Sequence, residues 1–437
     1  MAKAGIGYLE LLRGNLPYRR LVLANVISLL GDWLDLIAIT ELVTELSKKP
    51  ESPMTQATAL AGVMVARFLP TFLLGPIAGN VADRYPRHQV MVWANAVSAA
   101  CVLAFLWFLT PQGLPMIIVL MFLKMGAASF FIPANQASVP MVVPREHLQE
   151  ANALGSTTWS LMAVVGAIAG AFVVDAIGAR LALVVDALTF LVANFFLWKL
   201  ALPPADPSMS AKRGFHDFVD GLRYIAGHRE VVLPLFVKPL MGATGGALLY
   251  PLMAEHVWPE GFFGKSGLAF VNGMIYLAFG LGTLLGPLAM RRLGHADVPA
   301  MQRRLGPAFL VTSIFMIFFS LAGPFGLAFG HQVLSSLGRS VCWVYSTLLL
   351  QVLVPDRFRG RVFAVEFGLM TLSMTLLILL SQRAIDAHWL AGLLPGGMEG
   401  EVRALGVALS VIGLIGAVPY LLARPPQEPV SADSGAA

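Results

Sequence analysis

The sequence predicts an all-α membrane protein with twelve transmembrane helices in two pseudo-symmetric six-helix bundles. Three observations support this fold class. The chain of 437 residues is 57% hydrophobic and only 13% charged. Its apolar runs are long enough to cross a bilayer, and a short motif of the first half returns in the second half. A soluble protein of this length needs far more charge to cover its surface, so the bilayer is the solvent for most of the chain.

Twelve apolar segments reach the length of about 20 residues that a transmembrane helix needs. Gly and Pro occur within them, which neighbouring helices make tolerable in a membrane. The predicted segments are residues 19–45, 56–82, 89–110, 115–138, 151–177, 181–201, 232–256, 266–290, 304–322, 326–353, 361–383 and 402–423.

The basic residues indicate how these segments are oriented. If the N-terminus lies in the cytoplasm, most Lys and Arg residues of the loops lie there too, whereas Lys48, Lys49 and a few others lie outside. The positive-inside rule therefore predicts a multi-pass protein with both termini in the cytoplasm. Because topology accounts for the net charge of +5, we expect no nucleic-acid partner.

The chain divides at its one long loop. We predict an N-terminal bundle over residues 1–201, a cytoplasmic linker over 202–231, a C-terminal bundle over 232–424 and a disordered tail over 425–437. Apolar residues recur at helical spacing in the linker, which predicts an amphipathic helix on the inner membrane face. These apolar residues are Phe215, Phe218, Val219, Leu222 and Ile225.

Two pairs of matching segments relate the halves. Residues 73–78 (LLGPIA) return as residues 284–289 (LLGPLA), and the Val143-Pro144 segment matches the Val354-Pro355 segment at the same offset. Each half then holds six segments, and both halves have the same orientation because six is even. Parallel repeats of this kind are typical of transporters that rock two bundles around a central path.

The turn after the second segment, Gly79-x-x-x-Asp83-Arg84-x-x-Arg87, resembles the loop signature of the major facilitator superfamily. The resemblance implies the major facilitator fold in a bacterial inner membrane, a monomer without a cofactor, and proton-driven export by alternating access. More narrowly, the chain resembles the bacterial branch of macrolide-efflux and enterobactin-exporter-like permeases. The motifs for this branch span residues 28–32, 67–70, 185–190, 221–225 and 354–362.

The resemblance also implies a cytoplasmic gate in which Asp83 faces the N-terminus of the eleventh segment near Gly360. An anion is favoured there, because a helix N-terminus carries about half a positive charge. Two departures leave antiport, symport and uniport open: residues 166–170 lack the Gly-Pro pair usual in antiporters, and residues 374–378 lack the expected glycines. The expected gating residues are Gly79, Asp83, Arg84, Arg87, Arg361 and Glu366.

Charged residues inside the predicted segments each need a partner or a wet cavity, since an isolated charge at mid-bilayer costs about 2.5–3.5 kcal/mol. Asp32 lies about 18 Å into a core of about 30 Å, and Asp35 shares its helix face. Two carboxylates so close repel each other, so one should hold a proton near neutral pH, as a proton-coupling site requires. The structural alternative is that Asp32 caps or salt-bridges a neighbouring segment.

Two further charged residues, Arg67 and Asp186, are expected to have structural roles. Arg67 is predicted to pair with Asp35 or with Glu41 across the first two segments. Asp186 follows Arg180 by about 9 Å near the outer surface, where pairing at a helix end is expected. We therefore assign Arg67 and Asp186 to structural pairs.

Three bases lie on segments that line the central cavity in the family: Lys124, Lys238 and Arg339. They are the candidates for the substrate cavity, together with Trp159 and Trp343, and three cations there indicate an anionic or zwitterionic substrate. The alternatives are that the two lysines snorkel to the interface and that the aromatic rings only pack between helices.

The leading functional hypothesis is a secondary active transporter that exports a small amphipathic molecule, such as a drug or siderophore, coupled to protons. The alternative is a lipid or lysophospholipid transporter of the same fold, with an apolar groove open sideways to the bilayer. An enzyme is not expected, because the chain has no His-Glu-x-x-His motif and no Gly-rich phosphate loop with Lys. Cys101 and Cys342 lie in apolar runs and the histidines are scattered, so we expect no metal site.

Overall fold

The computed structural model describes residues 7–200, 202, 214–244, 246–261, 267–292 and 297–423. These residues form α-helices and three short 3₁₀ helices with no strand among them, which confirms the all-α prediction. The α-helices are α1 (Tyr8–Gly14), α2 (Leu16–Ser47), α3 (Gln56–Arg84), α4 (Arg87–Phe105), α5 (Leu114–Val142), α6 (Leu148–Ile177), α7 (Ala179–Trp198), α8 (Gly214–Gly227), α9 (Arg229–Ala243), α10 (Leu249–His256), α11 (Leu268–Arg292), α12 (Val298–Leu321), α13 (Phe325–Leu353), α14 (Asp356–Asp386) and α15 (Met398–Leu422).

Eleven helices of the described residues are long and apolar enough to cross a membrane. The seventh predicted segment supplies the twelfth crossing, and it is broken: α9 ends at Ala243 and α10 begins at Leu249. Gly242 and Gly246 lie beside the break, and glycine has little tendency to stay helical. The twelve-helix prediction is therefore confirmed, with one discontinuous helix that it did not anticipate.

The same packing pattern occurs in both halves. In the first half α3 packs on α5, α4 on α5, and α4 on α7; in the second half α11 packs on α13, α12 on α13, and α12 on α15. These pairs correspond once the second half is matched to the first in chain order. The repeat detected in the sequence is therefore a repeat of helix packing.

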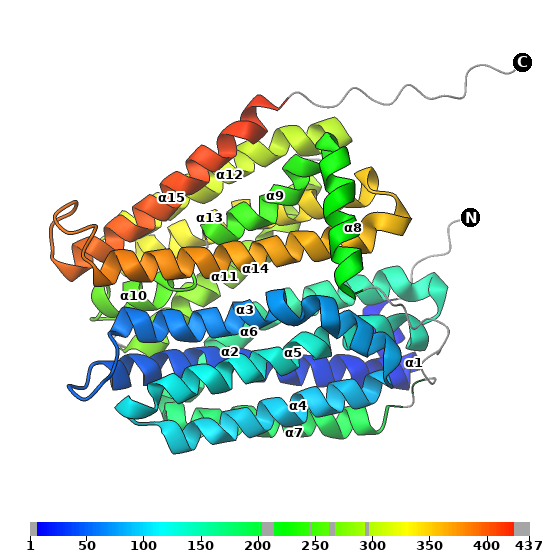
Figure 1. Cartoon of the computed structure of the whole chain (residues 1–437), viewed down its shortest axis with the longest axis horizontal. Coiled ribbons are helices and arrows are strands. Elements are labelled where there is room, and N and C mark those ends of the chain that lie inside the picture. The colour runs from blue at the N-terminus through cyan, green and yellow to red at the C-terminus, as the bar shows by residue number, and fades with distance from the viewer. Residues whose placement is uncertain are drawn as a thin grey trace, which may run out of the picture.

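The two most extensive contacts between the halves are those of α3 with α14 and of α6 with α11. Figure 1 shows α3 and α14 side by side at the centre of the molecule. Small residues allow the second pair to approach closely, since a Cβ atom on Gly273 would lie 2.4 Å from the Cβ of Ala171. A Cβ on Gly280 would similarly meet the backbone of Ala163 at 3.0 Å. Larger side chains at these glycines would push the two halves apart.

The predicted linker helix is present as α8, which runs across the ends of the spanning helices (Figure 1). Its apolar side packs on α14: Ile225 is buried with Val362 and Val365, whereas Leu222 is exposed. The side chains of residues 214–218 lie outside the described part, as do residues 203–213 and the predicted tail 425–437.

Both ends of the described chain lie on one face of the molecule, as Figure 1 shows. We call this face, which also holds α1 and α8, the terminal face. The opposite face holds the connections over residues 48–55 and 387–397, and we call it the loop face. An even number of crossings requires this arrangement.

Candidate functional site

The first half buries a cluster of charges around Lys124, at the middle of α5. The Lys124 Nζ atom lies 2.7 Å from Asp35 Oδ2, 3.2 Å from Asp32 Oδ1 and 3.5 Å from Asp186 Oδ2. Lys124, Asp35 and Asp186 are fully buried. One ammonium group therefore joins three helices, because the carboxylates come from α2 and α7.

Arg67 of α3 brings a fourth helix to this cluster. Its Nη1 atom lies 3.1 Å from Asp35 Oδ2, and its Nη2 atom donates to the backbone carbonyl of Asp32 at 3.0 Å. Of the two partners that the sequence left open for Arg67, the structure places Asp35 beside it. Asp186 does not form the helix-end pair expected for it: its carboxylate reaches inward to Lys124, because α7 packs directly on α2.

The charges of the Lys124 cluster do not balance. Three carboxylates face two cations, so the cluster carries one net negative charge when all five groups are ionised. Burying an unmatched charge is costly, and a buried carboxylate is commonly neutralised by a proton. Asp32 is 30% exposed at its side chain, which makes it the carboxylate with access to water. The cluster therefore has one carboxylate more than its two cations can neutralise, and of its three carboxylates only Asp32 is partly exposed.

Gly31, a residue that the sequence argument did not single out, makes this cluster possible. A Cβ atom on Gly31 would lie 2.1 Å from Thr189 Oγ1 and 2.4 Å from Asp186 Oδ1. The missing side chain thus lets α7 come close enough for Asp186 to reach Lys124. Gly31 is part of the motif at residues 28–32, but nothing in the sequence says which helix it faces.

The second half buries an ion pair between Lys238 of α9 and Glu366 of α14. The Lys238 Nζ and Glu366 Oε2 atoms are 2.7 Å apart, and both side chains are buried. The Trp343 ring of α13 lies beside this pair, with its centre 4.7 Å from Lys238 Nζ. Glu366 was expected to act with Arg361 at the gate; the structure instead pairs Arg361 with Asp220 of α8, at 3.4 Å.

The Arg339 side chain of α13 binds backbone carbonyls at the break in the seventh crossing. Its Nη1 atom donates to the Met241 carbonyl at 2.7 Å, and its Nη2 atom to the Thr244 carbonyl at 3.2 Å. The last carbonyls of a helix lack partners within it and carry partial negative charge, so a guanidinium group there stabilises the helix end. Arg339 is thus a cap for α9 rather than the free cavity cation that the sequence suggested.

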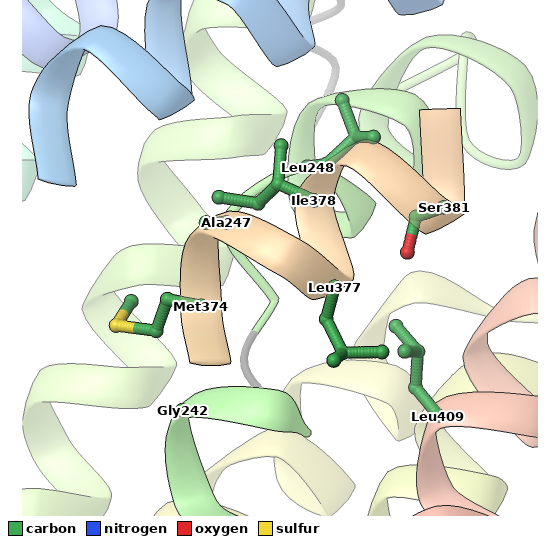
Figure 2. Close-up of a pocket in the computed structure, with 8 residues that line it drawn as sticks. All are labelled: Gly242, Ala247, Leu248, Met374, Leu377, Ile378, Ser381 and Leu409. Atoms are coloured by element: carbon green, nitrogen blue, oxygen red, sulfur yellow. The ribbon is translucent and has the colours of Figure 1, made fainter. Parts of the chain in front are cut away.

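A small cavity lies between the break, α14 and α15 (Figure 2). Its volume of about 10 Å³ has room for about one water molecule. Such a cavity is too small for a substrate. It is lined by Gly242, Ala247, Leu248, Met374, Leu377, Ile378, Ser381 and Leu409.

The three bases predicted to line the substrate cavity all have partners within the protein. Lys124 lies among carboxylates, Lys238 is paired with Glu366, and Arg339 caps a helix. The expectation of an anionic or zwitterionic substrate depended on these three cations being available to it. Because each already has a partner within the fold, they give no support for a substrate anion.

The predicted gate residues lie at the terminal face. Arg87 joins the turn between α3 and α4 to α5, since its Nη1 atom donates to the Ala137 carbonyl at 2.6 Å. Gly79 lies in the last turns of α3 with open space where a Cβ would be, and Arg84 is exposed. The side chain of Asp83 lies outside the described part of the structure. The proposed contact near Gly360 therefore stays a prediction.

An apolar groove of about 290 Å³ lies where the two halves meet at the side of the molecule. Val119 and Leu379, which line it, are nearly half exposed. The groove is formed by Gly62, Val65 and Ala66 of α3, by Ile118, Val119 and Phe122 of α5, and by Leu379 of α14.

Trp159 of α6, which was predicted to line the substrate cavity, is about half exposed. Among the described residues no group of His, Cys, Asp and Glu is placed to hold a metal ion.

A comparison with known families identifies the kind of protein that holds this cluster. A family model described as "Transmembrane secretion effector" matches residues 12–381. The chain belongs to the major facilitator superfamily. It is therefore a multi-pass membrane transporter of the efflux branch, and not an enzyme, as the sequence predicted.

Individual relatives of this transporter are distant. The "Uncharacterized MFS-type transporter YkuC" of Bacillus subtilis (strain 168) is 24% identical, over 62% of this chain and 66% of its own length, just under two thirds. "Macrolide efflux protein A" of Streptococcus pyogenes is 24% identical over 76% of this chain and 83% of its own length. The solved structure of a D-xylose-proton symporter has a TM-score of 0.72 at 12% identity, and covers 94% of this chain and 98% of that one, so it supports the fold alone.

Proposed function

We propose that this transporter exports a small amphipathic molecule from a bacterial cell, driven by protons and working by alternating access. The cluster around Lys124 is the observation that carries the proton coupling. Its three carboxylates exceed its two cations by one charge, so one proton makes it neutral. Asp32 is the carboxylate through which the proton enters and leaves, because its side chain is partly exposed.

A path from this cluster to the contact between the halves supports the coupling. Trp33, next to Asp32, packs edge-on against Tyr276 of α11 in the second half, with ring centres 5.5 Å apart. A proton on Asp32 weakens its attraction to Lys124, and α2 is then held less firmly against α5. Because α2 also contacts α11, the change reaches the surface along which the halves must move.

The direction and orientation of transport belong to this proposal as well. Export is supported by the family description and by a relative named for macrolide efflux. The basic residues of the loops support a cytoplasmic position for the terminal face in the inner membrane. We propose a monomer, since each half covers its charges within the same chain.

The alternative is a lipid or lysophospholipid transporter, and the side groove between α3, α5 and α14 favours it. This groove is lined by apolar side chains from both halves, which suits an acyl chain. The two functions differ in the molecule carried. Vesicles that move a labelled lysophospholipid but no labelled macrolide under a pH gradient would support the alternative.

Replacing Asp32 by Asn tests the proton coupling. With one carboxylate fewer, the Lys124 cluster is neutral without a proton. We expect the variant to fold and insert normally but to lose at least about 90% of pH-gradient-driven uptake of a labelled macrolide into inverted vesicles, an effect of about 1.4 kcal/mol or more. Infrared spectra of the purified variant should lack the titrating carboxyl band of the original protein.

Asp175→Asn is the matched control, because Asp175 is an exposed acid of α6 away from the cluster. This variant should keep its gradient-driven uptake and its infrared band. Undiminished uptake by the Asp32→Asn variant would remove Asp32 from the coupling role.

A further inference from the structure

Aromatic rings surround the ammonium group of Lys238 on several sides. Its Nζ atom lies 4.7 Å from the ring centre of Trp343, 5.3 Å from that of Phe367 and 5.5 Å from that of Phe363. Rings at such distances attract a cation through their negative faces. Trp343 and Phe367 also pack edge to face, with centres 5.9 Å apart, so the rings hold one another in place. We call Trp343, Phe363, Phe367 and Glu366 the aromatic cage.

Glu366 supplies the negative charge of this cage, and one of its two carboxylate oxygens is without a hydrogen-bond partner in the described part of the structure. Its Oε2 atom binds Lys238 at 2.7 Å. Its Oε1 atom is buried and has no hydrogen-bond partner in the described part of the structure. A buried carboxylate oxygen without a partner is costly, so an additional donor or positive charge here would be favourable.

The cage is closed at the bottom and open at the rim. Lys238 and Glu366 are buried, whereas Trp343 is 38% exposed and Phe367 is 42% exposed. The rim therefore consists of aromatic surface that an amphipathic molecule can contact before it reaches the carboxylate. Glu366 and Phe367 lie on α14, the helix that packs against α3 of the other half. Part of the cage therefore lies on a helix that contacts the other half.

We propose that the aromatic cage binds an organic ammonium group of the transported molecule, and that the Lys238 ammonium occupies the cage in its absence. The statement that the occupant is the cargo rests on the proposed function; the binding itself does not. Exchange of one ammonium for another leaves Glu366 paired throughout, which avoids an uncompensated buried charge. The flexible four-carbon side chain of Lys238 can leave without a change in the backbone of α9.

The site selects a cationic or zwitterionic molecule with an apolar surround. A carboxylate and three rings attract a quaternary or tertiary ammonium group far better than a neutral group of the same shape. The sequence led to an expected anionic or zwitterionic substrate through the three bases, whereas the cage favours a molecule with a positive charge.

The test uses the full-length protein, purified in detergent, and the variant Lys238→Met. Methionine keeps the length of the side chain but leaves the cage without its own cation. The probe is benzyltrimethylammonium, and neopentylbenzene is its neutral control of nearly the same shape. The binding readouts are the midpoint of thermal unfolding and the quenching of tryptophan fluorescence.

We expect benzyltrimethylammonium to bind Lys238→Met about tenfold or more tightly than the original protein, because it no longer competes with the lysine. It should also raise the midpoint of unfolding, since a ligand that binds the folded state stabilises it. The double variant Lys238→Met/Glu366→Gln has no net buried charge, so it should fold well and lose the preference for the cation. Trp343→Leu in the Lys238→Met background should weaken binding several-fold.

Equal binding of the cation by Lys238→Met and by the double variant would overturn the proposal, as would equal binding of the cation and neopentylbenzene by Lys238→Met. If Lys238→Met does not fold alone, added benzyltrimethylammonium should restore folding, and failure to do so counts against the cage. These readouts need neither a pH gradient nor transport. Failure of the Asp32→Asn prediction would therefore leave the cage intact, and the reverse also holds.

Discussion

Gly31 lies against α7 without room for a side chain. Its neighbours there are the Thr189 hydroxyl and the Asp186 carboxylate, both within 2.4 Å of where a Cβ would be. Because a protein interior is closely packed, a Cβ there would force the Thr189 hydroxyl and the Asp186 carboxylate to turn away or α7 to move. The distance between Asp186 and Lys124 is therefore set by a residue that carries no charge.

Gly31→Ala should separate α7 from α2 and weaken the Lys124 cluster. Overpacking of this kind costs about 1–3 kcal/mol, and the loss of the Asp186 contact adds to it. The measurement is the midpoint of thermal unfolding in detergent. Gly75→Ala is the matched control, because a Cβ at Gly75 of α3 meets nothing within 4 Å. Equal midpoints for the two variants would show that α7 has room to move.

Single residues also show where prediction from the sequence stopped. The sequence identified Asp32, Asp35, Arg67 and Lys124 as charges that need partners, and the structure brings all four together. It placed Asp186 at a helix end, because depth along one helix says nothing about the helix opposite. Lys238 and Glu366 were assigned to different sites for the same reason, since these two partners lie 128 positions apart in the chain.

At the scale of the element, the seventh crossing is the exception in the bundle. The break between α9 and α10 leaves backbone carbonyls without helical partners in an apolar environment, where each unsatisfied group is costly. Arg339 satisfies two of them from α13. The discontinuous helix is thus stabilised by a residue about a hundred positions away.

Arg339→Met should destabilise the C-terminal end of α9. Two hydrogen bonds from a charged group are lost and their carbonyls stay buried, which costs about 1.5–3 kcal/mol or more. Both the midpoint of unfolding and the protection of amide hydrogens near residues 241–248 should fall. Arg303→Met is the control, because Arg303 is an exposed base of α12. Unchanged amide protection in Arg339→Met would mean that the break needs no cap.

At the scale of the whole molecule, polar contacts tie the two halves together on the loop face. Asp386, at the end of α14, accepts hydrogen bonds from Thr55 and Thr58 at the start of α3, each at 2.7 Å. Gln382 donates to Thr58 at 3.0 Å, and Lys48 pairs with Glu255 nearby. These contacts join the first and second halves directly.

Asp386→Ala should open the loop face. The two hydrogen bonds from Thr55 and Thr58 are lost, and each contributes about 1 kcal/mol net, so the ratio of closed to open molecules should fall roughly thirtyfold. Spin labels on cysteines introduced at Glu51 and Leu393, after replacement of Cys101 and Cys342, report the distance between the halves. A longer distance should become populated in the variant.

The matched control for this prediction is Glu399→Ala. Glu399 is also an acid of the loop face, but its partner Arg403 belongs to the same half. Its distance distribution should stay that of the original protein. If Asp386→Ala does not lengthen the distance either, the contacts with Thr55 and Thr58 do not hold the face closed.

The sequence by itself determined the membrane environment, the twelve crossings, the two related halves and the family. These properties depend on composition, on the length of apolar runs and on local motifs, all of which lie along the chain. It also identified most of the charges that matter, because a charge inside an apolar run is conspicuous wherever it points.

Tertiary structure alone decided which charges meet. The balance of three carboxylates and two cations around Lys124, the cap that Arg339 places on α9, and the aromatic cage around Lys238 each join helices distant in sequence. The physical reason is that pairing energy depends on a few ångströms between side chains. Those distances are set by glycines such as Gly31 and by how the helices pack, and neither shows in the order of residues along one helix.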